Sequence, residues 1–290
     1  MGTDVCITVL HVSRDMAEDA IDEAMVELAG VEEVMSLYRP DSQVSVLNRQ
    51  GAIQRPDARL VDVLLKAEDM SRRSEGAFDV TVQPLWELWA AAKKQSRRPT
   101  PDQIAAAAAK VDWRKVELST ERIALKTPGM AITLNGIAQG YAADRVLDVL
   151  RTCGVEHALV NTGEIGALGD KGGGEPWTVG IQHPRRADAF IGAAKLTGGC
   201  LATSGDYQTA FSDDRKDNHI FDPATGRSPE EFSSVSVFAP KGVDADALST
   251  AVSVVGYERG LRLLEGTSGA EAMFAMKDGR VAMTARFPRA

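Results

Sequence analysis

The hydrophobic positions in the first third of the chain repeat every three to four residues, the spacing of helices that bury one face. After a predicted strand over 6–12, a helix is predicted over 13–30. Its inward residues are Met16, Ala20, Ala24 and Leu28. A second amphipathic helix is predicted over 59–73. At Thr100, a capping residue with proline next and Gln103 three positions on predicts another helix start.

Strand patterns and turns dominate the rest of the chain. A hairpin is predicted over 116–126, and a helix over 138–150 ends before Gly154. Further strands begin at His157, Trp177, Phe190 and Ser233. A helix is predicted over 246–265, and a tight turn over 277–280 joins two last strands. Because the strands are grouped at hairpin spacing, we expect an α+β fold with mixed, largely antiparallel sheets flanked by helices.

Composition and charge narrow the class of protein. Of the 290 residues, 44% are hydrophobic and 26% charged, which excludes a disordered chain. The formal charge of −8 and a pI near 5.2 argue against a nucleic-acid or anionic-lipid coating protein. No apolar run reaches the roughly 18 residues of a membrane span. We expect Cys6, Cys153 and Cys200 to be buried structural thiols, since their spacing fits no metal site.

The segment Asp246-Ala-Leu-Ser-Thr250 is the first candidate for chemistry. On a helix, Asp246, Ser249 and Thr250 share one face. One carboxylate and two hydroxyls form an oxygen-only ligand set that suits Mg²⁺ and not zinc. The alternative from the spacing alone is that Asp246 caps the helix and the hydroxyls are solvated.

A strand runs into a helix through two glycines at Asn135-Gly136-Ile-Ala-Gln139-Gly140. Free backbone N–H groups at such a junction can receive an anion or phosphate. The segment matches neither the P-loop nor the dinucleotide fingerprint, and a plain tight turn is an equal alternative.

Three further segments mix polar and aromatic residues. His219, with Asp222 as its orienting partner, is a candidate proton shuttle, and the alternative is a structural histidine. Tyr38 and Phe78 could stack on a flat ring or simply pack at loop–core junctions. The basic stretch over 93–101 is expected to be an exposed, solvated loop, with contact to a partner protein as the alternative.

Eight motifs in order give the chain a family resemblance over nearly its whole length. The first is Met1-Gly2-Thr3, and the other seven are SLYRPDSQVSVLN, GAFDVTVQPLWELW, ITLNGIAQGYAAD, VNTGEIGALG, LATSGDY, HIFDPATG and DALST. This order resembles the ApbE family of FAD:protein FMN transferases. The resemblance implies a T-fold-related architecture and one domain over 1–290, for which two lobes with the cofactor between them are one arrangement.

The resemblance implies the reaction and its cofactors. Family members bind FAD and Mg²⁺, transfer FMN from FAD to a threonine hydroxyl of an acceptor flavoprotein, and release AMP. For this chain it implies His219 as catalytic residue and a metal set of Gly136 (through its carbonyl), Asp246, Ser249 and Thr250. The implied cofactor-binding residues are Met1, Tyr38, Ala77, Phe78, Asp79, Gln139 and Ile220.

The sequence departs from the family pattern at three positions. Thr133 stands where many members have Asp, Gln139 replaces a charged residue, and Ser249 replaces the second Asp of some members. These departures leave two alternatives open: a flavin-binding carrier without transfer activity, and a pyrophosphatase that splits FAD into FMN and AMP with water.

The first residues of the chain indicate its location, and one internal motif indicates its acceptor protein. The opening residues lack a basic region before the apolar stretch, so no signal peptide is visible. In the family, Met1-Gly2-Thr3 normally follows an export signal or lipoprotein leader, which implies a periplasmic protein without membrane insertion of this chain. The ITLNGIAQG variant is similar to members associated with nitrous-oxide reductase maturation.

Overall fold

A computed structural model describes residues 2–290, and its centre is a seven-stranded sheet in the order β1-β5-β6-β9-β10-β11-β12. Every neighbouring pair in this sheet is antiparallel. The strands are β1 Cys6–Leu10, β5 His157–Asn161, β6 Ile165–Leu168, β9 Gly198–Gly205, β10 Phe232–Ala239, β11 Glu271–Met276 and β12 Val281–Met283. The predicted α+β class with antiparallel sheets is therefore confirmed.

Two small sheets accompany the central one. A three-stranded sheet has the order β2-β4-β3, with β2 Ala52–Gln54, β3 Val116–Leu118 and β4 Arg122–Leu125. The predicted hairpin over 116–126 is its β3–β4 pair. A separate hairpin is formed by β7 Trp177–Gln182 and β8 Phe190–Leu196.

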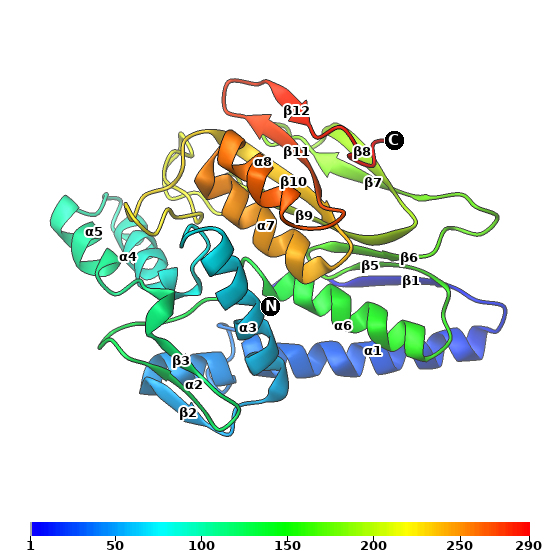
Figure 1. Ribbon diagram of the computed structural model, residues 1–290, viewed down its shortest axis with the longest axis horizontal. Coiled ribbons are helices and arrows are strands. Elements are labelled where there is room, and N and C mark those ends of the chain that lie inside the picture. The colour runs from blue at the N-terminus through cyan, green and yellow to red at the C-terminus, as the bar shows by residue number, and fades with distance from the viewer. Residues whose placement is uncertain (1) are drawn as a thin grey trace.

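Helices cover one face of the central sheet, as Figure 1 shows for α1, α6 and α7. The helices are α1 Arg14–Met35, α2 Gln43–Gln50, α3 Ala58–Arg73, α4 Gln83–Lys94, α5 Pro101–Ala108, α6 Ala138–Thr152, α7 Gly242–Val255 and α8 Tyr257–Glu265. Two short 3₁₀ helices are Val80–Val82 and Trp113–Lys115. Among residues 2–290, no helix combines the length and the apolar character needed to cross a bilayer.

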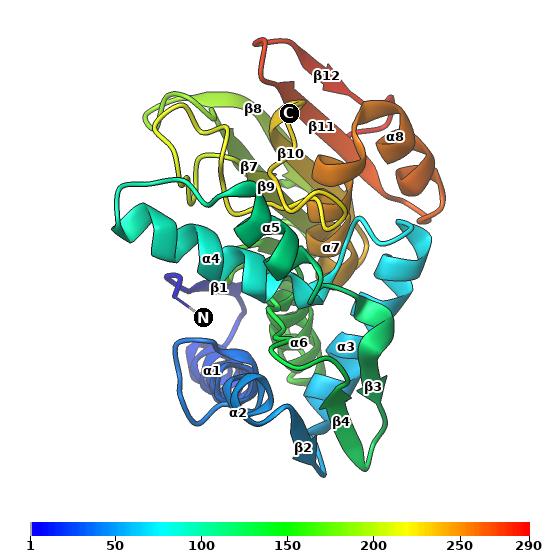
Figure 2. The same cartoon turned by 90° about the vertical axis from the view of Figure 1, so that its left-hand side faces the viewer.

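Alternation along the strands places a core on each face of the sheet. In β11, Ala272 and Phe274 pack in the large core under α6 and α7. Met273, between them, packs with Trp177 of the β7–β8 hairpin in a second core. A third, smaller core joins α4 and α5 to Phe221, and Figure 2 shows these helices below the yellow trace of the 206–231 segment.

Two glycines explain the errors in predicted helix ends. The first helix does not stop at Gly30, since this glycine has no positive φ and lies inside α1. Its missing side chain leaves room for the Arg59 guanidinium, because a Cβ there would lie 3.0 Å from Nη1. The predicted helix over 246–265 is instead two helices. Gly256, at φ 84° and ψ 177°, separates them.

Three other local predictions are corrected. Met16 is exposed, although Ala20, Ala24 and Leu28 are buried as predicted. Among the thiols only Cys200 is buried, whereas Cys6 is exposed and Cys153 half-buried.

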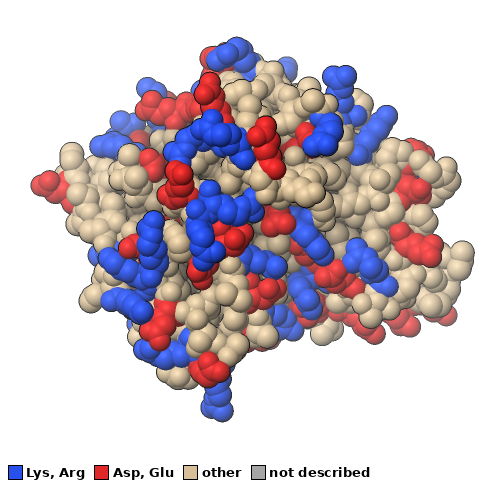
Figure 3. All heavy atoms as spheres, in the orientation of Figure 1, with Lys and Arg blue, Asp and Glu red and all other residues tan. Residues whose placement is uncertain are grey.

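Positive and negative side chains alternate over the face seen in Figure 3, so that face carries no broad single-sign patch.

The basic stretch is partly helical and tied down. α4 continues through Lys94, and the capping box at Thr100 is confirmed, with both hydrogen bonds to Gln103 present. Lys93 Nζ donates to the Ala210 carbonyl (2.5 Å), and Arg98 pairs with Asp217 (2.9 Å). The stretch therefore contacts the segment that carries His219.

Candidate functional site

One cavity collects most of the predicted site residues. It lies where the start of α6, the first half of α7, the end of β9 and the 206–231 segment meet. Its lining includes Ala77, Phe78, Asp79, Gly136, Gln139, His219, Ile220, Asp246 and Thr250. Segments from distant parts of the sequence thus converge on one hollow.

The contact between α6 and α7 positions the metal-site candidate. A Cβ on Gly140 would overlap the Gly242 carbonyl and lie 2.7 Å from Asp246 Cβ, so only glycine allows this close approach. Asp144 of α6 accepts hydrogen bonds from the first N–H groups of α7, at Gly242 (2.7 Å) and Val243 (3.0 Å). α7 therefore begins before Asp246, and Asp246 is not its N-cap.

The carboxylate of Asp246 lies at the N-terminus of α6, where the backbone N–H groups could otherwise bind an anion. Its Oδ2 accepts a hydrogen bond from the Gly140 N–H (2.9 Å). Burial raises the pKa of Asp246 to about 7, against the opposing effect of the Gly140 and Gln139 N–H groups. Of the two alternatives left open by the sequence, an anion site and a plain tight turn, the first is met here by the carboxylate of Asp246 itself and not by free donors.

Glu164 is a second buried carboxylate in this cavity. Its Oε2 accepts a hydrogen bond from the Thr203 N–H (2.9 Å). Burial, and then the charge of Asp246, raise the pKa of Glu164 well above its ordinary value. Sequence reasoning missed Glu164, although its motif VNTGEIGALG was recognised; the available signal was an acidic residue beside a glycine directly after a strand.

The hydroxyl groups divide into two sets. Thr250 lines the cavity with Ser204, and their oxygens are 3.1 Å apart. Ser249 is fully buried and does not line the cavity. Its hydroxyl donates to the Asp246 carbonyl (2.9 Å) and lies 2.7 Å from Ser204 Oγ. Only Thr250 of the two predicted hydroxyl ligands therefore faces the cavity.

His219 is oriented by backbone. Its Nδ1 lies 3.3 Å from the Thr209 carbonyl, which can only accept, so Nδ1 carries the proton and Nε2 is left as an acceptor. The predicted partner Asp222 instead closes its own turn, accepting from the Ala224 N–H (2.9 Å) and the Thr225 hydroxyl (3.1 Å). The orienting role assigned to Asp222 is wrong.

The pH dependence of activity should report this environment. Burial lowers the pKa of His219, outweighing the Thr209 hydrogen bond and the charge of Asp206. If neutral His219 accepts a proton, its contribution to the rate should be lost when the pH drops through that lowered pKa. We expect the acid limb that depends on His219, measured between about pH 5 and 8, to lie below the usual value of 6.5. A limb at or above 6.5 that disappears in His219→Ala would contradict this.

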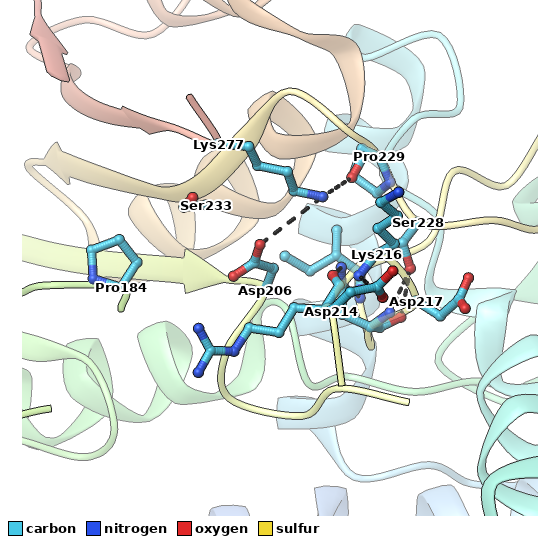
Figure 4. Close-up of polar contacts among 12 residues, drawn as sticks. Pro184, Asp206, Asp214, Lys216, Asp217, Ser228, Pro229, Ser233 and Lys277 are labelled. Atoms are coloured by element: carbon cyan, nitrogen blue, oxygen red, sulfur yellow. Dashed lines mark hydrogen bonds and ion pairs between the residues drawn. The ribbon is translucent and has the colours of Figure 1, made fainter. Parts of the chain in front are cut away.

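An ion cluster anchors the base of the 206–231 segment. Arg185 holds buried Asp206 through two hydrogen bonds (2.6 and 2.8 Å) and also donates to Ser233 Oγ (2.9 Å). Figure 4 shows Lys277 reaching between Asp206 and Pro229, with Nζ 2.9 Å from the Pro229 carbonyl. Asp206 therefore connects the segment to the β7–β8 hairpin and to the loop after β11.

Replacing Asp206 with asparagine should loosen this segment. The change leaves two cations without their counter-charge, and we expect a loss of about 1–3 kcal/mol, below that of a fully buried pair because Arg185 is 35% exposed. Thermal denaturation and limited proteolysis between residues 206 and 231 measure the effect. Asp278→Asn, which breaks an exposed pair with Arg280, is the matched control. Equal stability and protease resistance in the two variants would refute the anchor.

The remaining predicted residues border the cavity or lie outside it. Phe78 is buried, and Asp79 accepts hydrogen bonds from Thr81 (2.8 and 2.6 Å) and the Trp113 N–H (3.0 Å). Tyr38 is 74% exposed and lines an adjoining hollow that shares Gln139 and His219 with the cavity. Met1 lies outside the described residues.

Thr133 and the glycine junction have a local structural role as well. The Thr133 hydroxyl accepts a hydrogen bond from the Asn135 N–H (3.2 Å), and the turn continues directly into α6. Thr133, Asn135 and Gly136 all line the cavity. The junction is thus a tight turn that also forms one wall of the site.

Comparison with known proteins agrees with the motif order. Residues 1–274 match the ApbE family. A Treponema pallidum protein named FAD:protein FMN transferase is 33% identical, with 98% of this chain and 85% of that protein covered. A Haemophilus influenzae protein of the same name is 32% identical over 86% of this chain and 76% of its own length.

Solved structures show the same fold. The apo flavinyl transferase ApbE from Pseudomonas stutzeri has a TM-score of 0.83 at 31% identity, covering 98% of this chain and 91% of that one. The ApbE protein from Thermotoga maritima has a TM-score of 0.86 at 29% identity, covering 100% and 97%. The narrower link to nitrous-oxide reductase maturation stays a prediction. By sequence and by fold, this chain belongs to the ApbE family.

Proposed function

We propose that this protein is a Mg²⁺-dependent FAD:protein FMN transferase that moves FMN from FAD to a threonine hydroxyl of an acceptor protein and releases AMP. The observation that carries the proposal is the convergence of Asp246, Thr250, Gly136 and His219 on one cavity. The names of the relatives supply the reaction class. The periplasm stays our proposed location.

The residues present fit a magnesium ion. Asp246 and Glu164 are both buried, and neither forms a salt bridge with a Lys, Arg or His within residues 2–290. Buried charges need a counter-charge. Gly136 leaves space beside Thr250, since a Cβ there would lie 2.8 Å from the hydroxyl oxygen. Asp246, Thr250 and the Gly136 carbonyl would hold the ion, which when bound neutralises the pyrophosphate of FAD.

The reaction is a substitution at phosphorus. The threonine oxygen of the acceptor forms a bond to the FMN phosphorus, and the bond from that phosphorus to the bridging oxygen of the pyrophosphate breaks. AMP leaves with the bridging oxygen and its electron pair. The hydroxyl proton passes to Nε2 of His219, whose Nδ1 is held by the Thr209 carbonyl. Atoms and charge balance without any further reactant.

The assay that tests this proposal separates it from two alternatives. Purified protein is incubated with FAD, Mg²⁺ and a candidate acceptor domain, and in-gel flavin fluorescence is read together with AMP release. Fluorescent acceptor with AMP supports transfer. AMP without fluorescent acceptor indicates a pyrophosphatase, and neither signal indicates a flavin carrier.

A further inference from the structure

The turn between β5 and β6 has a well-defined conformation and places the carboxylate of Glu164 at the cavity. Gly163 has φ +103°, and a Cβ there would overlap the Gln139 side chain. The Thr162 hydroxyl donates to the Gln139 carbonyl (3.0 Å), and the Thr162 N–H to the Glu164 carbonyl (3.0 Å). The turn is therefore locked onto the start of α6, with Glu164 on the cavity wall.

The Glu164 carboxylate has few partners. The side chain is 8% exposed, and its one hydrogen bond within the described chain comes from the Thr203 N–H. No cationic side chain of residues 2–290 pairs with it, although the chain contains 33 Lys and Arg. Two desolvated carboxylates in one cavity are unfavourable unless protons or a cation neutralise their charge.

The departure from the family pattern at Ser249 also concerns the number of carboxylates in the cavity. Some family members have a second aspartate there, but in this chain Ser249 is directed at Ser204 and the Asp246 carbonyl. A second acidic group still faces the cavity, and it comes from the β5–β6 turn rather than from α7. Two carboxylates and one divalent cation are neutral together, and Mg²⁺ commonly takes one or two carboxylates.

We propose that Glu164 is the second carboxylate of the metal site, bound to the cation directly or through a water molecule. The inference rests on the proposed function, since it concerns the cation which that function requires. It assigns a metal-binding role to a residue of the VNTGEIGALG motif. It also accounts for a family member that lacks the second aspartate on the metal helix.

Metal titration tests this assignment without relying on catalysis. Mn²⁺ is titrated into the full-length protein, alone and with ADP, and bound metal is followed by electron paramagnetic resonance. We expect Glu164→Gln, which keeps an acceptor for Thr203, to weaken Mn²⁺ binding by about tenfold or more. Glu271→Gln, a buried glutamate paired with Arg286 on β11, is the matched control and should bind like the parent protein.

Every outcome of this titration decides the question. Parent-like Mn²⁺ affinity in folded Glu164→Gln, or no Mn²⁺ binding by the parent protein, overturns the inference. If Glu164→Gln does not fold, Glu164→Asp and Glu164→Ala replace it; the first keeps the charge on a shorter side chain and the second removes the carboxylate. Parent-like Mn²⁺ affinity in both of these variants would also overturn the inference. Failure of FMN transfer in a parent protein that shows the expected Mn²⁺ pattern would instead refute the proposed function.

Discussion

Replacing Asp246 with asparagine should reduce Mg²⁺-dependent FMN transfer by roughly 10²- to 10³-fold, because a metal contribution of several kcal/mol is lost at about 1.36 kcal/mol per tenfold. Asparagine has nearly the same volume and keeps an acceptor for the Gly140 N–H. The change thus removes the charge and little else. Initial rates of transfer at saturating FAD, measured over a range of Mg²⁺ concentrations, give the effect.

The stability of the same variant separates loss of metal from loss of fold. In the metal-free protein, Asp246 is buried beside Glu164 and its charge opposes folding. Asp246→Asn should therefore melt no lower than the parent protein when metal is absent. Ser249→Ala, one turn along the same helix but not lining the cavity, is the control and should keep most activity. Full activity in Asp246→Asn would refute the metal assignment.

Replacing Gly140 with alanine should destabilise the protein and remove activity together. The new methyl group would overlap the Gly242 carbonyl, which is backbone and cannot rotate away. Helices α6 and α7 would have to separate, and Asp246 would lose its hydrogen bond to residue 140. At about 3 kcal/mol or more for such overpacking, we expect the melting temperature to fall by roughly 5–10 °C.

Thermal denaturation and transfer rates measure the Gly140 effect, with a second glycine as control. Gly198 has no atom within 4 Å of an added Cβ and has no positive φ. Gly198→Ala should therefore change the melting temperature little. If Gly140→Ala melted like Gly198→Ala and kept its activity, close packing of α6 on α7 would not be what positions Asp246.

The periodic elements of the fold could be predicted from the sequence, because each depends on local spacing. The stripe through Ala20, Ala24 and Leu28 is such a case. The role of a glycine could not, because it depends on what lies opposite in the fold. Gly30 lies inside a helix and faces Arg59, whereas Gly256 has a backbone conformation that separates two helices.

The candidate site shows the same limit. Helical spacing placed Asp246 and Thr250 on one face, but it could not show that Ser249 turns toward Ser204. Glu164 offered only a weak local signal, an acidic residue beside a glycine, and its place in the cavity with Asp246 depends on a distant helix. Likewise, the orientation of His219 by Thr209 depends on the path of the 206–231 segment rather than on the HIFDPATG motif.

The measurement that tests the central claim most directly is the intact mass of an acceptor domain after incubation with the protein, FAD and Mg²⁺. The account predicts a mass increase equal to FMN less one water, one AMP released per modified acceptor, and no increase when the acceptor threonine is replaced by valine. An acceptor of unchanged mass, with AMP and free FMN accumulating together, would contradict it.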